Sequence, residues 1–536
     1  MQRFLNWLDK LAVTNEENKT AQWLDRIAFF FLILMALSAP HSIAATQTAW
    51  LIGNFAWLIR LFIKPRPKLL KTPLNLALWI FFAWSVVTCF FSYAPDISFE
   101  KLRGVALFLI FFYVANNLRS FRAVKFIVSA LIFSAMVVVL WTPLERIIGR
   151  GVEVYGVAAE SPLTKTIYVE NNNEPIVIKD GDALLEVNKK KIKSPEQLVE
   201  EIEKNETARL KFYRPDYYLI VQIKRSDLLE GATANEKLGI TAWKKSRNWR
   251  SMGFYGHWTT FSEVLQLIAS LVFGLLIASF SDRKEDFEKR KFSVFGKFTF
   301  SPLLLFCFAA MCLALLLNVT RASQLGLIAS MFSIVFLVNR KMILVLAVIF
   351  LPVALGGLLF IQQSRNVGYF DRNDDSIKYR ESVYQEGANL WTQNARHFLV
   401  GVGMDSIKRY AKDWRLFEDG KLPLGHFHST LLQLAVERGL PALLLWFWIV
   451  WLYAREMKSR ISDSGFQIKE NQSEIREIKS GIRNLKSGIL LGVFGGLVGF
   501  FTSGIVHYNL GDAEVAMIFF LLMGIGVSLK GMKDEG

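Results

Sequence analysis

Cysteine is scarce in this chain of 536 residues, and the three present, Cys89, Cys307 and Cys312, all lie within apolar runs. This excludes a disulfide framework, and the sequence has no Cys-x-x-Cys redox motif. It also contains neither a Walker A phosphate loop nor the His-Glu-x-x-His motif of zinc proteases. The motifs of P-loop nucleotide hydrolysis, zinc-dependent proteolysis and dithiol redox chemistry are therefore all missing.

Apolar residues, in contrast, are abundant. Hydrophobic residues make up 52% of the chain, with 44 Phe and 15 Trp. Apolar runs close to 20 residues long recur, and each can cross a hydrocarbon core of about 30 Å. The net charge of +16 comes largely from cations in short loops between these runs. The positive-inside rule explains that placement, so we expect a polytopic, all-α membrane protein that does not bind nucleic acid.

Twelve membrane spans are predicted, and every second connection between them is basic. An even number of spans with both termini in the cytoplasm requires this alternation. The spans are predicted near Ile27–Ala39, Ala45–Leu61, Leu74–Phe91, Gly104–Ala115, Phe126–Thr142, Thr260–Phe280, Leu303–Leu317, Gln324–Val338, Ile343–Ile361, Thr430–Tyr453, Gly488–Phe501 and Ala513–Val527.

Two long insertions interrupt the spans, and the alternation of charge places both on the outer face. Long loops inside a membrane bundle are usually functional or form a domain. We therefore divide the chain into residues 1–148 (spans 1–5), 149–230 (a folded insert), 231–361 (spans 6–9), 362–428 (a long outer loop) and 429–536 (spans 10–12).

The first insertion has the pattern of a small α+β domain. Thr166–Val169 and Tyr217–Ile223 alternate as strands do, and Pro195–Lys204 is predicted to be a helix. The segment Ile178–Asn188, with the sequence IKDGDALLEVN, resembles a strand of bacterial PDZ domains and is followed by a hairpin and a helix. PDZ domains bind extended peptides at a sheet edge, so a peptide or protein partner is one reading. A spacer or docking module without a free peptide ligand is the other.

Polar residues gather where the spans meet the outer face. Arg250 precedes the sixth span in the stretch Arg-Ser-Met-Gly-Phe-Tyr, and Thr320–Ser323 (Thr-Arg-Ala-Ser) joins the seventh and eighth spans. The second outer loop contains Tyr379-Arg380-Glu381 and Gly401-Val402-Gly403. It ends at His426-Phe427-His428-Ser429, and Leu432, Glu437 and Gly439 follow in the tenth span. An arginine at such a boundary is often only a snorkelling anchor. Arg321 fits that reading poorly, because the positive-inside rule disfavours cations in a short outer loop.

The order of these motifs resembles the O-antigen ligase and polymerase superfamily of bacterial envelope glycosyltransferases. The resemblance covers Arg250–Gly439 and implies a GT-C-like bundle of about 12 helices in the bacterial inner membrane, with a periplasmic active site. It further implies metal-independent, inverting transfer of a glycan from undecaprenyl diphosphate, without a cofactor. The acceptor hydroxyl would belong to lipid A–core or a related glycolipid. The PDZ-like insert departs from the common pattern of the family.

The resemblance also implies roles for particular residues. Arg250, Arg321 and Arg380 would bind the donor diphosphate, because the guanidinium fork matches phosphate oxygens. His428 would be the catalytic base, since it directly precedes Ser429 as in the family's His-(Asn/Ser) element. On a helix His426 and His428 would face different directions, whereas in an extended segment they would share a side. The supporting positions are His426, Ser429, Glu437, Ser323, Gly401 and Gly403, and no metal ligands are predicted.

Two other functions remain open from the sequence. A polysaccharide polymerase of the same superfamily would use the same donor with a growing glycan as acceptor. A PDZ-bearing transporter or envelope sensor would be no enzyme at all. A transporter should show internal repeats and ionisable residues near the middle of the membrane. No such repeat is evident and the polar residues cluster at one face, which argues against a transporter.

Overall fold

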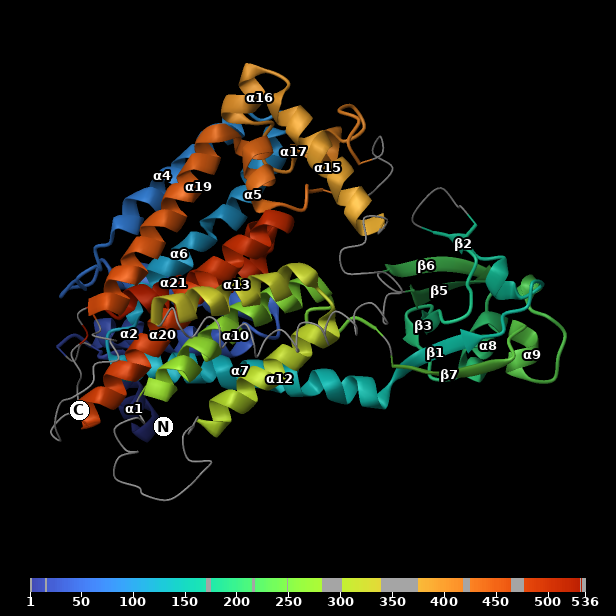
Figure 1. Ribbon diagram of the computed structural model, residues 1–536, viewed down its shortest axis with the longest axis horizontal. Coiled ribbons are helices and arrows are strands. Elements are labelled where there is room, and N and C mark those ends of the chain that lie inside the picture. The colour runs from blue at the N-terminus through green and yellow to red at the C-terminus, as the bar shows by residue number, and fades with distance from the viewer. Residues whose placement is uncertain are drawn as a thin grey trace. The chain divides into compact units, whose positions relative to one another are not determined.

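The computed structural model describes residues 2–14, 17–169, 175–214, 217–247, 249–281, 301–338, 375–417, 425–463, 477–530 and 532 (Figure 1). These residues are mostly helical, with one small antiparallel sheet. They divide into two compact units, a helical unit and a unit of residues 140–251 that contains the sheet. The protein is a multi-pass membrane protein with a small α+β insert, as the sequence predicts.

The helices outside the sheet are connected mainly by short segments. In chain order they are α1 (Gln2–Ala12), α2 (Lys19–Ser38), α3 (Ile43–Arg60), α4 (Pro73–Phe90), α5 (Pro95–Val105), the 3₁₀ helix η1 (Ala106–Phe108), α6 (Leu109–Asn117), α7 (Phe121–Ile148), α10 (Trp258–Ser281), α12 (Pro302–Asn318), α13 (Arg321–Val338), α15 (Asp375–Thr392), α16 (Ala395–Val400), α17 (Ser406–Tyr410), α19 (Thr430–Asp463), α20 (Glu477–Val506), the 3₁₀ helix η5 (Asn509–Gly511) and α21 (Ala513–Ser528).

The described helices coincide with the predicted spans at all but one position. Seven helices are long and apolar enough to cross a membrane, namely α2, α4, α7, α10, α13, α19 and α20, and α12 and α21 are shorter apolar helices. The fourth predicted span is wrong as a single helix, because η1 separates α5 from the nine-residue α6. The ninth predicted span, Ile343–Ile361, lies outside the described residues.

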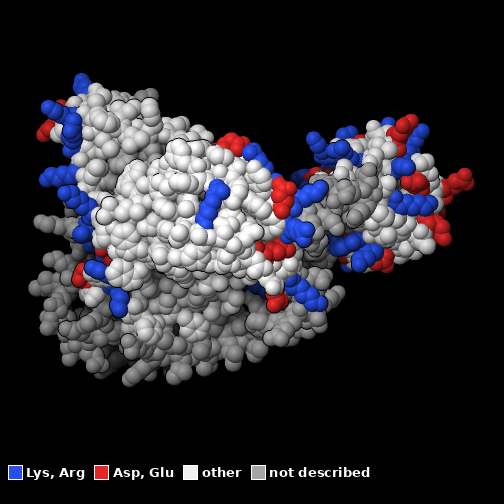
Figure 2. All heavy atoms as spheres, turned by 90° about the horizontal axis from the view of Figure 1, so that it is seen from above, with Lys and Arg blue, Asp and Glu red and all other residues white. Residues whose placement is uncertain are grey.

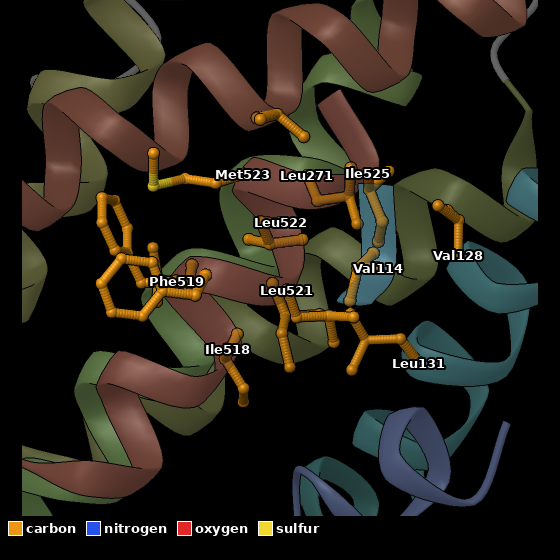
Figure 3. Packing of buried hydrophobic residues seen from close by; sticks show 14 of the residues in the cluster. Val114, Val128, Leu131, Leu271, Ile518, Phe519, Leu521, Leu522, Met523 and Ile525 are labelled. Carbon is orange, nitrogen blue, oxygen red and sulfur yellow. The ribbon is translucent and has the colours of Figure 1, made fainter. Parts of the chain in front are cut away.

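The core of the helical unit surrounds α21. Every residue of α21 from Val515 to Ser528 is buried. Figure 3 shows Ile518, Leu521 and Ile525 of this helix among apolar side chains from other helices. Much of the helical surface that faces the viewer in Figure 2 is uncharged, and large apolar side chains such as Phe133 are exposed on this unit. A helical bundle that is apolar inside and outside is what a lipid environment selects.

The sheet unit is antiparallel and has its own apolar core. Its strands are β1 (Arg150–Tyr155), β2 (Ile167–Tyr168), β3 (Ala183–Val187), β4 (Lys190–Lys191), β5 (Thr207–Arg214), β6 (Tyr217–Lys224) and β7 (Ala242–Ser246). The order is β2-β6-β5-β3-β1-β7, and β4 pairs with β3. The helical segments are α8 (Pro195–Glu203), α9 (Ala234–Leu238), η2 (Pro162–Thr164) and η3 (Arg225–Asp227). The strands predicted at 166–169 and 217–223 and the helix predicted at 195–204 are confirmed.

The sheet continues beyond Glu230, where the sequence suggested the end of the folded insert. Strand β7 lies at residues 242–246 and pairs with β1, with Arg150 opposite Ser246. The first and last strands of the unit are therefore neighbours, which brings the two ends of the inserted segment together. The compact unit consequently extends to Ser251.

Replacing residues 150–246 with a short Gly/Ser linker should leave membrane insertion of the helices intact. The reason is that Arg150 and Ser246 are paired across the sheet, so a few flexible residues span the gap. Size-exclusion chromatography of the detergent-solubilised variant is the measurement, with the intact chain as reference. An aggregated or uninserted product would show that the helical unit depends on the insert for folding.

Candidate functional site

A cavity of about 360 Å³ lies within the helical unit, and its lining contains both polar and apolar side chains. The polar lining comes from Lys101, His257, Thr260, Asp405, Lys408, His426, Glu437, Arg438, His507, Tyr508, Asp512 and Glu514. The apolar lining includes Leu78, Phe81, Val105, Leu107, Phe108, Trp446, Ile449 and Phe520. A concave site that combines polar and apolar side chains fits an amphipathic ligand.

The Gly401–Gly403 turn, which directly precedes the cavity-lining residues Met404 and Asp405, docks on an interruption of α19. Gly439 has a φ of +72°, and Pro441 two residues later has no N–H to give to the carbonyl of Glu437. That carbonyl instead accepts the N–H of Gly403 at 2.9 Å, and the Val436 carbonyl accepts the N–H of Val402 at 2.8 Å. The Gly-x-Gly and Glu-x-Gly motifs, whose nearest residues Gly403 and Glu437 are 34 positions apart in the chain, therefore form one unit.

Both motif glycines at this junction are required by close approach. A Cβ at Gly401 would lie 2.4 Å from the carbonyl carbon of Glu437, and one at Gly439 would lie 2.2 Å from the carbonyl oxygen of Leu399. Gly401 also has a φ of +79°, a conformation that other residues adopt only with strain. These contacts explain why glycine occupies the two positions.

The carboxylates of Glu437 and Asp405 line the cavity next to this turn. Glu437 is buried, and its Oε1 accepts the backbone N–H of Asp405 at 2.9 Å and the side-chain amide of Gln433 at 2.8 Å. Asp405 Oδ2 lies 2.7 Å from Lys101 Nζ and 2.9 Å from Lys408 Nζ. Glu437 thus has a structural role in holding the 401–405 turn, and Asp405 gathers two cations at the cavity.

The segment with the two histidines is positioned by its backbone and by Phe427 between them. Phe427 is fully buried against Phe417, and its N–H donates to Gln433 Oε1 at 2.8 Å. Tyr384 Oη donates to the carbonyl of His428 at 3.1 Å. Ser429 then caps the N-terminus of α19, since its Oγ accepts the N–H of Leu432 at 3.4 Å. Since Gln433 also contacts Glu437, this segment and the 401–405 turn share one anchor.

The rings of His426 and His428 lie on the same side, with centroids 4.4 Å apart. The Nδ1 of His426 accepts the backbone N–H of His428 at 3.2 Å, so neutral His426 carries its proton on Nε2. Burial, then the positive Lys408, lowers the pKa of His426. Burial, with His426 and Arg380, lowers the pKa of His428 to about 3. Both imidazoles are therefore neutral at pH 7.

Ser323 belongs to a buried polar network that connects four helices. Its Oγ donates to Glu263 Oε1 on α10 at 3.2 Å, and Ser503 Oγ on α20 donates to Oε2 of the same carboxylate at 2.7 Å. Asn509 donates to Ser503 at 3.0 Å and accepts from Thr430, the first residue of α19, at 2.9 Å. The Thr-Arg-Ala-Ser motif on α13 is therefore held to the start of the helix that follows the histidines.

The three predicted arginines are half-buried and lie in different parts of the chain. Arg380 follows Tyr379 on α15. The centre of the Tyr379 ring lies 6.1 Å from the centre of the His428 ring. Arg321 is the first residue of α13, beside the Ser323 network. Arg250 belongs to the sheet unit, where its N–H donates to Tyr213 Oη at 3.2 Å. Among the described residues, neither Arg321, Arg380 nor His428 is part of the cavity lining, whereas His426 and Glu437 are.

Sequence reasoning missed most of the polar groups that line the cavity, four of which are close in the chain to predicted spans or motifs. Arg438 lies in the variable position of the Glu-x-Gly motif, and His507, Tyr508 and Asp512 lie between α20 and α21. Burial keeps the pKa of His507 well below its ordinary value. The signal that could have found the last three is a cluster of polar residues in a short outer connection, the same signal that singled out Arg321. In the part of the chain that the structure describes, no three His, Cys, Asp or Glu side chains are grouped to hold a metal ion.

Comparison with known families gives one match at the site. Residues 306–447 match the family model described as O-antigen ligase, a range that includes α13, the Gly401–Gly403 turn, both histidines and the interruption of α19. The match supports the resemblance to the O-antigen ligase superfamily and, in general terms, a glycosyltransferase activity of the ligase or polymerase type. A comparison with the curated proteins gave no match.

Proposed function

From the O-antigen ligase domain that the chain carries over residues 306–447, we propose that the protein is an O-antigen-ligase-like glycosyltransferase. In this proposal it transfers a glycan from undecaprenyl diphosphate to an acceptor hydroxyl at the periplasmic face of the bacterial inner membrane. The acceptor is lipid A–core or a related glycolipid. The reaction is inverting and needs no metal.

The chemistry requires a base and a positive environment. The acceptor oxygen attacks the anomeric carbon of the donor sugar, the bond from that carbon to the diphosphate oxygen breaks, and the acceptor proton passes to the base. His428 is the proposed base: it is neutral in the free protein, and the negative charge of the bound diphosphate must raise its low pKa toward neutrality for it to take the proton. Arg250, Arg321 and Arg380 are the proposed ligands of the departing diphosphate, whose negative charge grows as the bond breaks.

One observation carries the proposal, namely that motifs far apart in the sequence are hydrogen-bonded to one another next to the cavity. The Gly401–Gly403 turn, the histidine segment and Glu437 are connected through Gln433 and the interruption of α19. Arg380 is close enough to His428 to lower its pKa, which supports a diphosphate bound beside the base. A base and a cation side by side is the arrangement that displacement of a diphosphate needs.

The form of the glycan in a deletion strain tests the proposal. Loss of a ligase should leave finished polymer on the lipid carrier, with little glycan on the acceptor. Loss of a polymerase should instead leave single repeat units on the carrier. That result would identify the protein as a polymerase of the same superfamily. Unchanged glycans on both carrier and acceptor would reject a glycosyltransferase role. Complementation by the intact gene is the control.

We also propose that the sheet unit is a PDZ-like module. The supporting features are the β3–β4 hairpin, turned at Asn188 and Lys189, both of which have positive φ, and the helix α8 that follows it. Such a module would bind an extended peptide of a protein partner at a sheet edge. This assignment concerns partner binding and leaves the transfer chemistry to the helical unit.

A further inference from the structure

Glu263 is a buried carboxylate that the proposed chemistry does not use. It lies on α10, five residues after the helix begins at Trp258, and is 0% exposed. Its two oxygens accept the hydroxyls of Ser323 and Ser503, so the group acts only as an acceptor, as an ionised carboxylate does. Such a charge inside a membrane span is costly unless a partner compensates it.

His507 is the ionisable partner of this carboxylate. Its Nδ1 lies 3.8 Å from Glu263 Oε1, and among the described residues no lysine or arginine forms an ion pair with Glu263. The same buried Nδ1 has no hydrogen-bond partner in the described part of the chain. A carboxylate beside Nδ1 favours the tautomer that carries the proton there, which leaves Nε2 as the proton acceptor.

His507 also connects Glu263 to the cavity. It lies between α20 and η5 and belongs to the cavity lining, whereas Glu263 does not. Both residues lie outside the range 306–447 that matches the O-antigen ligase family. The family match therefore assigns neither of them a role.

The backbone places His507 close to the proposed base. Its carbonyl accepts the backbone N–H and the hydroxyl of Thr430, both at 3.2 Å, and Thr430 is two residues after His428. Burial, and then the charges of His426 and His428, lower the pKa of His507, so its ring is neutral at pH 7. The ionisable groups that act on the pair are His257, Arg380, His426 and His428 at His507, and Asp512 at Glu263. A neutral imidazole near both a base and a carboxylate can accept a proton at one nitrogen and donate one from the other.

The proposed reaction creates a need for such a pathway. His428 takes the acceptor proton while the bound diphosphate favours its charged form. Once the diphosphate leaves, burial, His426 and Arg380 again disfavour a positive charge on His428 and lower its pKa. The imidazolium must therefore lose its proton before the next turnover.

We propose that His507 passes this proton from His428 to Glu263, which stores it until the products leave. The inference rests on the proposed function, because that reaction supplies the proton. An N–H bond of His428 breaks and one forms at Nε2 of His507, while the Nδ1–H bond of His507 breaks and an O–H bond forms on Glu263. His507 stays neutral and only changes tautomer. The 3.8 Å separation shortens to hydrogen-bonding distance in the loaded enzyme, as catalytic contacts of unliganded sites often do.

The test compares the first turnover with repeated turnover in the purified, detergent-solubilised full chain. Glu263→Gln keeps the shape of the side chain but cannot take up a proton, and His507→Gln removes the shuttle. In both variants we expect a near-normal rate under single-turnover conditions, because His428 is intact, and a kcat lower by about 10²-fold. After one turnover, infrared difference spectra of the intact chain should show the carbonyl band of a newly protonated carboxyl group, and both variants should lack it.

Gln266→Met is the matched control for helix packing. Gln266 is buried on the same helix as Glu263 and donates to Ser330 of α13 at 3.1 Å, but it is not part of the cavity lining. Its loss weakens packing without removing an ionisable group. The single-turnover rate and kcat should therefore fall by the same factor, and the infrared band should persist.

The outcomes separate the relay from the proposed function. Equal losses of the single-turnover rate and kcat in Glu263→Gln and His507→Gln, or an unchanged kcat in both, would overturn the relay. A carboxyl band that persists in Glu263→Gln would also overturn it. If the intact chain transfers glycan and the variants show no such split, the glycosyltransferase stands and only the relay fails. If the intact chain transfers no glycan, the proposed function fails and the relay fails with it.

Discussion

His428→Ala is expected to lower the rate of glycan transfer by about 10²- to 10⁴-fold, the usual cost of removing a general base. Donor binding and protein level should stay near normal, because the backbone of His428, rather than its ring, is hydrogen-bonded to Tyr384 and His426. The measurement is a single-turnover transfer assay with purified protein and lipid-linked donor. Single-turnover conditions separate the chemical step from product release.

His426→Ala is the matched control for this prediction. It removes a ring from the cavity lining and the acceptor for the N–H of His428, so we expect a milder loss through altered loop placement. The reversed result, with the larger loss at His426, would assign the base to that residue. Near-normal transfer by His428→Ala would exclude His428 as the base.

The pH dependence follows from the direction of the pKa shift. Because burial, His426 and Arg380 lower the pKa of His428 to about 3, the free enzyme keeps this imidazole neutral as the pH falls from 8 to 5. The value of kcat/KM, which reports the free enzyme, should therefore show no loss near pH 6.5 from this residue. Bound diphosphate adds negative charge beside Arg380 and should raise the pKa of His428 in the enzyme–substrate complex. Because kcat reports that complex, kcat should fall more than kcat/KM as the pH is lowered.

Arg321→Lys is expected to lower transfer by about 10- to 100-fold, although the charge is conserved. A lysine cannot donate the paired hydrogen bonds that a guanidinium offers to a diphosphate, and one such contact contributes about 1.5–3 kcal/mol. The position favours an anion in a second way, because Arg321 begins α13, where backbone N–H groups have no helical acceptor. Donor binding and transfer should fall together in the same assay.

Comparable substitutions show how specific this effect is. Arg250→Lys should have a similar effect if Arg250 also binds the diphosphate, whereas Arg380→Lys should be milder if it positions the acceptor. Arg455→Lys, at an exposed site on α19, is the matched control and should retain full activity. Full activity of both Arg250→Lys and Arg321→Lys at normal protein levels would make these arginines membrane anchors rather than donor ligands.

The sequence predicted the helices more securely than the sites. An apolar run of about 20 residues forms a helix in a membrane, because the backbone has no water there and must satisfy its own hydrogen bonds. That rule recovers α10, α19 and α20 from composition alone. It fails at the fourth span, because a run of apolar residues does not reveal the break between α5 and α6.

Residue types and their order in the chain were enough to suggest a base, several cations and a family. They indicate what chemistry is available, since histidine, arginine and glycine each have properties that follow from the side chain alone. The match to the O-antigen ligase family covers the same stretch of chain as most of those motifs. The sequence alone therefore determines the family resemblance and the types of side chain available for the chemistry.

Which residues share a cavity was decided only by the tertiary structure. Pro441 leaves the Glu437 carbonyl without a helical donor, and Gly403 supplies one from 34 residues away. That contact depends on how two elements pack, so no local pattern predicts it. For the same reason the sequence pattern did not identify Arg438 as a cavity-lining residue, since that position follows from packing rather than from its neighbours in the chain. Spacing along the chain records local geometry, whereas a site is assembled by long-range packing that spacing does not record.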